Sequence, residues 1–582
     1  MRSIIIKSSI PLTQAQKNKL EVALQKKHKE EEVRFSYTLE NVVGGVVVID
    51  GEKVYDSTVA TSLHNFKQKS VSYINRHLSP GRAELPMLWA SKLADMVSLD
   101  ISHSYCGRVI ASADGIITID GLSECVYFEL LKVGKDNYAI AMNLMSDCVK
   151  AMLITSNKNI EYGALVNRTG KTVEVPVGEN LLGRVINPLG KPVDGNSVLH
   201  FEKTDRIEKP APKIMDRSKV NRPLETGILA IDSMVPIGRG QRELIIGDRQ
   251  TGKSSIAIDA IINQRDKNVI CIYVAIGQRG SNINQLVQKL VKANAMQNTV
   301  VVVSTADDSA ALQYIAPYTG CTIAEEFMNQ GKDVLIVYDD LTKHANAYRS
   351  ISLLLKRPSG REAYPGDIFY VHSKLLERSA QLSKEKGGGS ITAIPIVETQ
   401  AGDISQYIPT NVISITDGQI YLESELFHSG VRPALNVGLS VSRVGGSAQY
   451  KGIKKLSAQL RLDLAHFREM ALFTQFGADV DENTKAILDK GRKITELLKQ
   501  REGEPMSIDK EMIYLYIINK HLAKIPENRV KEYVAGFYNY FVNSSFTDVN
   551  EIRANGYLSE KIEKVINEDI KNYNIYFFNK RK

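Results

Sequence analysis

The chain has 582 residues, more than a single hydrophobic core usually supports, so several domains are expected. Its composition, 43% apolar and 24% charged, is typical of a globular protein that folds in water. The net charge of +8 comes from 74 basic and 66 acidic residues interspersed along the chain, a pattern that argues against a nucleic-acid-binding surface. No apolar run approaches the roughly 18 residues of a membrane-spanning helix, so we expect membrane contact only through partners.

The cysteines and the first residues bear on the compartment. Five cysteines are scattered without paired spacing, which predicts a reducing environment and neither a disulfide framework nor a metal site. Residues 1–6 contain too short an apolar run for a secretory signal, and they lack the composition of a transit peptide. We therefore expect a cytosolic chain of bacterial type.

Residues 1–78 are predicted to form a small α/β unit. Leu20 and Leu24, four positions apart, indicate one face of a helix over 12–29. Residues 46–49 and 52–55 are strand-like runs on either side of Asp50-Gly51, a dipeptide typical of hairpin turns because both turn positions favour positive φ.

The middle of the chain changes pattern twice. Residues 79–103 are predicted as a linker followed by a helix near 87–99. From 104 to 180, short apolar runs alternate with turn residues at regular spacing, which is typical of a small β-barrel.

Residues 181–450 show strands alternating with helices, and residues 451–582 show helical spacing of apolar side chains with few Gly and Pro. Near-continuous β-branched runs joined by helices indicate a largely parallel sheet covered on both faces. The predicted strands are residues 244–246, 269–276, 300–303, 334–338, 391–397 and 412–415.

One motif carries recognisable chemistry, the phosphate-loop pattern Gly247-Asp248-Arg249-Gln250-Thr251-Gly252-Lys253-Ser254. Its glycines let backbone N–H groups curl around phosphate oxygens, Lys253 can reach the β- and γ-phosphates, and Ser254 can ligand Mg²⁺. A predicted strand leads in, and a predicted helix over 255–262, beginning at Ser255, adds the positive end of its dipole. The motif predicts a nucleotide site.

Asp339 follows the apolar run 334–338 and suits the second half of such a site, where a carboxylate holds the magnesium shell. A strand that ends in two aspartates is by itself commonly just a capped strand end. The position of Asp339 downstream of a phosphate loop favours the metal role.

Five segments of the chain, among them the phosphate loop and the stretch around Asp339, resemble the α subunit of F-type ATP synthases. The resemblance extends over roughly residues 81–505. The resemblance implies a β-barrel, a RecA-like nucleotide domain over 181–450, and a C-terminal helical domain. It also implies alternation with catalytic β-type subunits in a three-plus-three ring around a γ-type shaft, with peripheral stalk subunits, at the cytoplasmic side of the cell membrane. The matching segments are residues 247–255, 338–341, 361–367, 398–403 and 437–445.

Gln278 bears on catalysis. In the catalytic β relatives, an acid follows the strand after the phosphate-loop helix, and the matching place here holds Gln278. Hydrolysis requires a carboxylate that orients and activates water, and an amide cannot act as a base at neutral pH. The resemblance therefore implies a site that binds ATP or ADP with Mg²⁺ without turning it over.

Arg443 resembles the residue that α subunits contribute to the neighbouring β site. A guanidinium on the γ-phosphate stabilises transition-state charge, the role of an arginine finger. Without the resemblance, an arginine after an apolar strand would most often form a structural ion pair. We expect Ser440, in the same loop, to help position Arg443.

On the adenine side, the resemblance places Phe369 near the base and matches Gln500 to an adenine-side glutamine. Two positions depart from the family. Lys374 replaces a common arginine, and Glu502 stands where a second glutamine is frequent. These departures bear on adenine specificity and leave the phosphate site intact.

Residues 9–13, 44–48 and 53–59 resemble the C-terminal part of the δ stalk subunit of the same enzymes. Since δ docks on the front of α, a fusion would raise the effective concentration at that contact. An unrelated α/β extension is the alternative. The helices beyond about residue 510 exceed the usual α length and are predicted to be an extension.

Three other functions remain open at this point. The same head could drive motility or export, to which the fused front domain is the only hint. An RNA translocase would need an OB-type front domain with exposed aromatics, and no clear cluster of these is present. A self-sufficient hexameric ATPase would need a carboxylate in place of Gln278. We expect no nucleic-acid partner.

Overall fold

The computed structural model describes residues 2–8, 12, 14–27, 33–39, 46–50, 53–56, 106–155, 160–195, 201–475 and 481–579. The chain divides into two compact units, Met1–Val173 and Glu174–Lys582, which are considered separately. The linker and helix predicted between 79 and 103 lie outside the described residues, as does Gly51 of the predicted hairpin turn.

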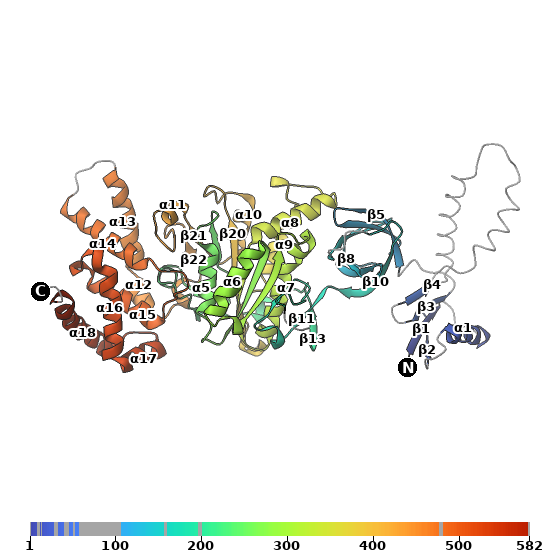
Figure 1. Ribbon diagram of the computed structural model, residues 1–582, viewed down its shortest axis with the longest axis horizontal. Coiled ribbons are helices and arrows are strands. Elements are labelled where there is room, and N and C mark those ends of the chain that lie inside the picture. Colours follow the sequence, from blue (N-terminus) through green and yellow to red (C-terminus); the bar gives the residue numbers. More distant parts are fainter. Residues whose placement is uncertain are drawn as a thin grey trace. The chain divides into compact units, whose positions relative to one another are not determined.

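The front segment forms a sheet with one helix (Figure 1). Its described strands, in sheet order, are β2 (Val33–Leu39), β1 (Arg2–Ser8), β3 (Val46–Asp50) and β4 (Lys53–Asp56), and the helix is α1 (Gln14–Lys27). β1 and β2 run parallel, whereas β3 and β4 form the predicted antiparallel pair. Leu20 and Leu24 of α1 pack on the buried Ile4, Ile6 and Val48, so the small α/β fold is confirmed.

The second part of this unit is a closed barrel, also as predicted. Apolar side chains from alternate strand positions fill its interior, including Val109, Ile117, Leu131 and Val166. In barrel order, its described strands are β10 (Leu165–Thr172), β5 (Cys106–Ala113), β6 (Ile116–Asp120), β9 (Val149–Leu153), β8 (Asn137–Leu144) and β7 (Glu129–Val133).

The second unit is built on a twisted sheet that is parallel except for its last described strand, β22. Successive strand residues point to opposite faces. Tyr273 lies in the core that includes α5, while Val274 faces Gly320 in α7, so helices cover both faces. In sheet order, the described strands are β12 (Val185–Ile186), β18 (Thr299–Thr305), β17 (Val269–Gln278), β19 (Asp333–Asp339), β20 (Ser390–Glu398), β16 (Leu244–Gly247), β21 (Gly418–Leu422) and β22 (Val441–Ser442).

The helices and short strand pairs of this domain complete it. Two small antiparallel sheets join β11 (Glu174–Val177) to β13 (Lys203–Arg206) and β14 (Pro223–Leu224) to β15 (Ile237–Gly238). The described α-helices are α4 (Leu229–Met234), α5 (Lys253–Ile262), α6 (Gly280–Lys292), α7 (Ala310–Asn329), α8 (Leu341–Leu354), α9 (Ile368–Leu376), α10 (Tyr407–Ile415) and α11 (Ser424–His428).

One predicted strand is wrong. Residues 412–415 form the last turn of the helix α10, and the strand is β21, a few residues later. Ile408, Val412 and Ile415 are buried at spacings of four and three, which is one face of a helix. A short apolar run cannot by itself distinguish these two states.

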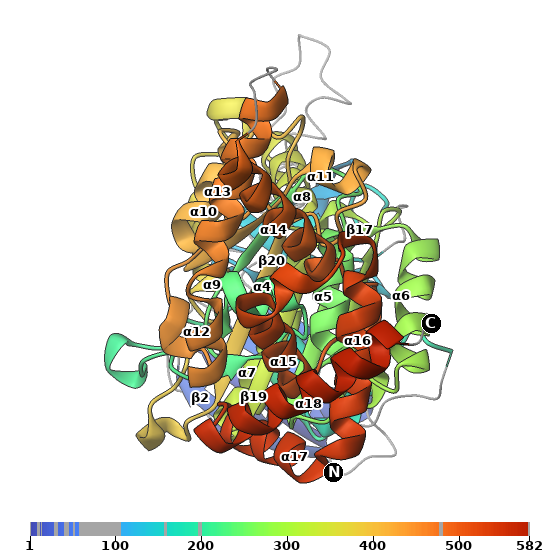
Figure 2. The ribbon, with the colours of Figure 1, turned by 90° about the vertical axis from the view of Figure 1, so that its left-hand side faces the viewer.

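The C-terminal segment is helical, as predicted. α15, α16 and α18 lie against one another, joined by aromatic contacts such as Tyr533 with Phe577 (Figure 2). Leu456 and Leu460, four positions apart, belong to different helices, α12 and α13, because the chain turns between them. The described helices are α12 (Lys451–Ser457), α13 (Leu460–Gln475), α14 (Glu482–Leu498), α15 (Ile508–Lys520), α16 (Val530–Ser544), α17 (Phe546–Asn555) and α18 (Glu560–Asn579).

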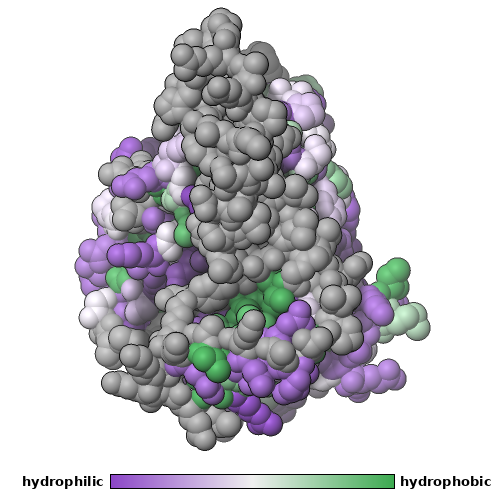
Figure 3. Space-filling model, turned by 90° about the vertical axis from the view of Figure 1, so that its right-hand side faces the viewer, coloured by the Kyte–Doolittle hydropathy of each residue, from purple (hydrophilic) through white to green (hydrophobic). Residues whose placement is uncertain are grey.

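Hydrophilic side chains predominate among the coloured residues in Figure 3, with small apolar areas between them. Of the helices in the described ranges, none has both the length and the apolar character needed to cross a membrane.

Gly320 tests the close packing of α7 on the sheet. A Cβ at this position would lie 2.4 Å from Cγ2 of Val274. Gly320→Ala is therefore expected to destabilise the domain by about 1–3 kcal/mol through overpacking, despite the better helix propensity of alanine. Gly280→Ala is the matched control, because no atom lies within 4 Å of its Cβ. Equal urea-unfolding midpoints for the two variants would contradict this packing.

Candidate nucleotide-binding site

The phosphate loop lies between β16 and α5. Gly252 adopts a positive φ of 91°, which turns the chain into the helix that starts at Lys253. The ammonium of Lys253 is buried beneath the loop and donates to the carbonyls of Gly247 and Asp248 at 3.0 and 2.5 Å. Burial lowers the pKa of Lys253, while the carboxylates of Glu398 and its neighbours act in the opposite direction. The loop thus holds a cation where a phosphate chain can lie.

Asp248 fixes the loop from outside the cavity. Its carboxylate accepts hydrogen bonds from Oγ1 of Thr399 at 2.6 Å, from N of Gly402 at 2.9 Å and from Oγ of Ser424 at 3.0 Å. Burial raises the pKa of Asp248, but these hydrogen bonds outweigh it and the net pKa is lowered. The carboxylate of Asp248 therefore joins the phosphate loop to the segments after β20 and β21 through hydrogen bonds.

The predicted loop residues divide into two groups. Residues 250–255 line a cavity of about 680 Å³. Gly247, Asp248 and Arg249 form the loop without lining this cavity, and Nε of the exposed Arg249 pairs with Oε2 of Glu398 at 3.1 Å.

Ser254 and Asp339 meet at the carboxyl edge of the sheet. Oγ of Ser254 donates to Oδ2 of Asp339 at 2.8 Å, and the Tyr273 hydroxyl donates to the same oxygen. Nε2 of Gln278, the last residue of β17, donates to Oδ1 of Asp339 at 3.2 Å. A hydroxyl and a carboxylate are the hard oxygen donors that suit Mg²⁺.

These donors would not hold a metal by themselves. Within the described ranges no group of three or more His, Cys, Asp and Glu side chains is arranged to bind a metal ion. The remaining ligands of a magnesium ion here would have to be phosphate oxygens and water, which is the arrangement that the sequence predicts.

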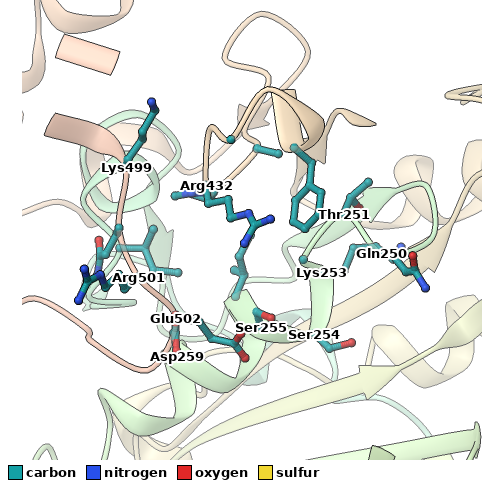
Figure 4. Close-up of a pocket in the computed structure, with 18 of the residues that line it drawn as sticks. Gln250, Thr251, Lys253, Ser254, Ser255, Asp259, Arg432, Lys499, Arg501 and Glu502 are labelled. Atoms are coloured by element: carbon teal, nitrogen blue, oxygen red, sulfur yellow. The ribbon is translucent and has the colours of Figure 1, made fainter. Parts of the chain in front are cut away.

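The far end of the cavity is formed by two loops. Gln250, Thr251 and Lys253 lie at one end and Lys499 and Arg501 at the other, with Arg432 between them (Figure 4). The guanidinium of Arg432 lies 4.5 Å from the ring centroid of Phe427, so a flat, positively charged surface faces the cavity. Such a surface suits an aromatic base.

Gln500 and Glu502 line this end, as predicted, but they differ in what they offer a ligand. Nε2 of Gln500 donates to the carbonyls of Gly227 at 2.7 Å and Glu504 at 2.8 Å, so this amide mainly joins two backbone segments. Oε1 of Glu502 pairs with Nζ of Lys289 at 2.6 Å.

The adenine-side prediction for Phe369 and Lys374 needs correction. Both belong to α9 and neither lines the cavity, and Nζ of Lys374 pairs with Oε1 of Glu208 at 2.6 Å. Phe427 and Arg432 occupy that place instead. Phe427 lies in the short helix α11 and Arg432 in the irregular chain that follows it, where no periodic pattern marks them. The only sequence signal was an aromatic and a cation between two recognisable motifs.

Arg443 and Ser440 lie outside this cavity. Arg443 follows β22 and is exposed. The hydroxyl of Ser440 is buried, donates to O of Asn436 at 2.6 Å and accepts from N of Tyr421 at 2.9 Å. Ser440 therefore holds the loop together, and Arg443 is free to face a neighbour.

Asp259 is an unusual carboxyl in the cavity wall. Burial, with a contribution from the charge of Glu502, raises the pKa of Asp259 to about 6, although a hydrogen bond from N of Gly503 at 2.8 Å opposes the shift.

Comparison with known proteins agrees with this geometry. Residues 227–442 match the nucleotide-binding domain of the ATP synthase alpha/beta family, and residues 449–573 match the C-terminal domain of its chains. An ATP synthase subunit alpha from Acetivibrio thermocellus is 58% identical over 463 residues, which are 79% of this chain and 91% of that protein. This chain belongs to the family of ATP synthase alpha subunits.

Other alpha subunits agree. Those of Caldanaerobacter subterraneus and Clostridium botulinum are 53% and 55% identical, covering 84% and 80% of this chain and 97% and 93% of their own lengths. The family membership confirms a nucleotide-binding subunit of the F-type ATPase and synthase complex. Neither motility nor an RNA translocase receives support from these relatives.

The family matches settle two further points. Residues 2–69 match the ATP synthase delta (OSCP) subunit, which confirms the δ-like front domain. The match over 449–573 includes α15 to α17 and most of α18. The prediction that the helices beyond 510 are an extension is therefore wrong, because the front domain shifts the numbering of an ordinary C-terminal domain.

Variants of Arg432 and Lys374 test which of the two residues contacts the base of a bound nucleotide. Arg432→Ala is expected to weaken binding of Mg-ATP to the isolated chain about tenfold, since a cation–π contact contributes roughly 1–2 kcal/mol. Lys374→Ala should change the affinity by less than about twofold, because its ammonium is committed to Glu208. Titration with a fluorescent ATP analogue measures both, and the reverse order would restore the original assignment.

The carboxyl of Asp259 should make stability depend on pH. Its pKa rises from 3.8 to about 6 on folding, so the folded state binds the proton more tightly. The contribution of Asp259 to stability is then largest at low pH and falls by roughly 1–3 kcal/mol as the pH rises through about 4 to 6. Asp259→Asn lacks this loss. The unfolding midpoint across this range should diverge between the two, while Asp266→Asn, whose side chain is 81% exposed, should follow wild type.

Proposed function

We propose that this chain is the non-catalytic alpha-type subunit of an F-type head, which binds Mg-ATP or Mg-ADP and supplies Arg443 to the catalytic site of a beta-type partner. The observation that carries the proposal is the position of Gln278. Its amide ends β17 and donates to the carboxylate of Asp339, in the cavity that the phosphate loop lines.

The cavity binds nucleotide through charge and hydrogen bonding. Residues 250–255 and the N-terminus of α5 cradle phosphate oxygens, and Lys253 supplies positive charge. A magnesium ion held by Ser254 and, through water, by Asp339 would neutralise phosphate charge. Arg432 and Phe427 would stack on the base.

The same cavity is poorly equipped to activate water. The amide of Gln278 donates to Asp339 and cannot remove a proton. Glu398 also lines the cavity, but its carboxylate is paired with Arg249 on the other side. Nucleotide bound here therefore serves binding and assembly rather than turnover.

Arg443 supports the role in the neighbouring site. It is exposed after β22, outside the cavity of its own chain, and Ser440 holds the loop that carries it. A guanidinium that enters a partner's site stabilises charge on the transferring phosphate. This chemistry fits an alternating ring of three alpha-type and three beta-type subunits.

The wider assembly follows from the family. We infer a gamma-type shaft inside the ring, peripheral stalk subunits reached through the δ-like domain, and a peripheral position at the cytoplasmic side of the membrane. The proposed domains are 1–78 (δ-like), 79–103 (linker and helix), 104–180 (barrel), 181–450 (nucleotide-binding) and 451–582 (helical).

ATPase assays test the assignment. The chain alone should be inert, and the complex with its beta-type and gamma-type partners should hydrolyse ATP. Arg443→Ala should lower kcat of the complex by about 10³-fold, the usual contribution of an arginine finger. Arg265→Ala, which removes an exposed arginine outside both sites, should leave kcat unchanged.

Gln278→Glu provides a second check. A carboxylate at this place would face the carboxylate of Asp339, where the amide now donates at 3.2 Å, so we expect weaker Mg-ATP binding rather than a new activity. Vigorous ATP hydrolysis by the unmodified chain alone would overturn the non-catalytic assignment.

A further inference from the structure

A partly buried ion pair lies beneath the loop that carries Arg443. Arg242, just before β16, binds the carboxylate of Asp417 through two hydrogen bonds. Its Nε lies 3.0 Å from Oδ2 of Asp417, and its Nη2 lies 2.9 Å from Oδ1. The third nitrogen of the Arg242 guanidinium, Nη1, donates to Oε1 of Glu377. The Arg242 side chain is 13% exposed, so this is a shielded, bidentate contact of the kind that fixes geometry.

The backbone of Asp417 transmits that fixed position to Arg443. The N–H of Asp417 donates to O of Arg242 at 2.8 Å, and its carbonyl accepts from N of Arg443 at 2.8 Å. β21 begins at the next residue, Gly418, which pairs with Ser442 in the antiparallel register of β21 and β22. One residue therefore joins the ion pair to the main chain from which the Arg443 side chain projects.

A buried carboxyl group, that of Glu243, lies at the floor of this loop. Oε2 of the buried Glu243 accepts from Nε2 of Gln241 at 2.6 Å, and the same nitrogen contacts Oγ of Ser442 at 3.2 Å. Burial and the charge of Asp417 raise the pKa of Glu243 well above its usual range, against the opposing effects of Gln241 and Arg443. Gln241 thus links Glu243 to Ser442, the residue that precedes Arg443.

We propose that Asp417, held by Arg242, is a positioning residue for the arginine that acts in the partner's site. The inference rests on the proposed role of Arg443. An arginine finger acts only if its guanidinium reaches the transferring phosphate precisely, and a misplacement of about 1 Å can cost about 10²-fold in rate. Release of the Asp417 carboxylate loosens the peptide to which Arg443 is hydrogen-bonded, while the guanidinium itself remains intact.

The test is a double-mutant cycle in the assembled complex with beta-type and gamma-type subunits. Asp417→Asn keeps the size and the backbone carbonyl but weakens the fork with Arg242. We expect kcat to fall about 10- to 100-fold with little change in KM for ATP. In an Arg443→Ala background, measured with radiolabelled ATP, Asp417→Asn should cause no further fall.

The matched control is Asp333→Asn. Asp333 also pairs with two arginines, Arg222 at 2.6 Å and Arg239 at 2.6 Å, but it lies at the amino end of β19. It should leave kcat unchanged in both backgrounds. Arg242→Lys, which keeps the charge and loses the fork, serves if Asp417→Asn does not assemble, and the same outcomes apply to it.

The outcomes separate this inference from the proposed function. Unchanged kcat in Asp417→Asn, or an equal fall with and without Arg443, would overturn the positioning role. Full activity of Arg443→Ala would instead overturn the proposed function itself. Binding of a fluorescent ATP analogue to the chain's own cavity should be unchanged by Asp417→Asn, which distinguishes loss of position from loss of fold.

Discussion

Parallel pairing of β16, β17, β19 and β20 determines where the chemistry of this chain lies. Strands that run in one direction all end at the same edge, and here the register pairs Gly247 with Glu398 and Ala275 with Asp339. Gly247, Gln278, Asp339 and Glu398, which are far apart in sequence, are therefore neighbours at one edge. Tyr273, buried between α5 and the sheet, adds a hydroxyl to this edge.

At that edge, the surroundings of Asp339 support the proposed binding without turnover. Its two oxygens accept hydrogen bonds from Ser254, Tyr273 and Gln278, so three side chains fix the position of this carboxylate. A carboxylate at 278 would have a free lone pair for a water proton, but it would also repel Asp339. The amide at 278 avoids that repulsion between carboxylates, but it cannot act as a base. Asp339 is therefore held in place, and position 278 cannot activate water.

The sequence predicts those parts of the candidate site whose residues are close together along the chain. The phosphate loop is contiguous, its strand and helix flank it directly, and Asp339 ends a long apolar run, so each of these could be predicted from neighbouring residues. The end of the cavity that would hold the base of the nucleotide could not be predicted in this way. Phe427 belongs to the short helix α11 and Arg432 to irregular chain, and their meeting with Gln500 depends on how the helical domain packs against the nucleotide domain. The mistaken strand at 412–415 has a related cause, because burial of one face of α10 and burial of a strand produce the same short apolar run.

Two arginines with different tasks, Arg432 and Arg443, lie at the two ends of one segment after β21. The chain between them is held from α13, where Arg461 donates to O of Val437 at 2.9 Å and Arg468 donates to Oδ1 of Asn436 at 3.0 Å. The carbonyl of Asn436 in turn accepts from Ser440, close to Arg443. A ligand that contacts Arg432 thus binds one end of a braced segment whose other end presents Arg443. Since binding stabilises whatever structure the ligand contacts, the proposed nucleotide in this chain's own cavity would favour the ordered form of the segment that carries Arg443. Under the proposed function, a subunit that binds nucleotide and leaves it unhydrolysed contributes to catalysis in this way, because its ligand remains bound while the neighbouring site turns over.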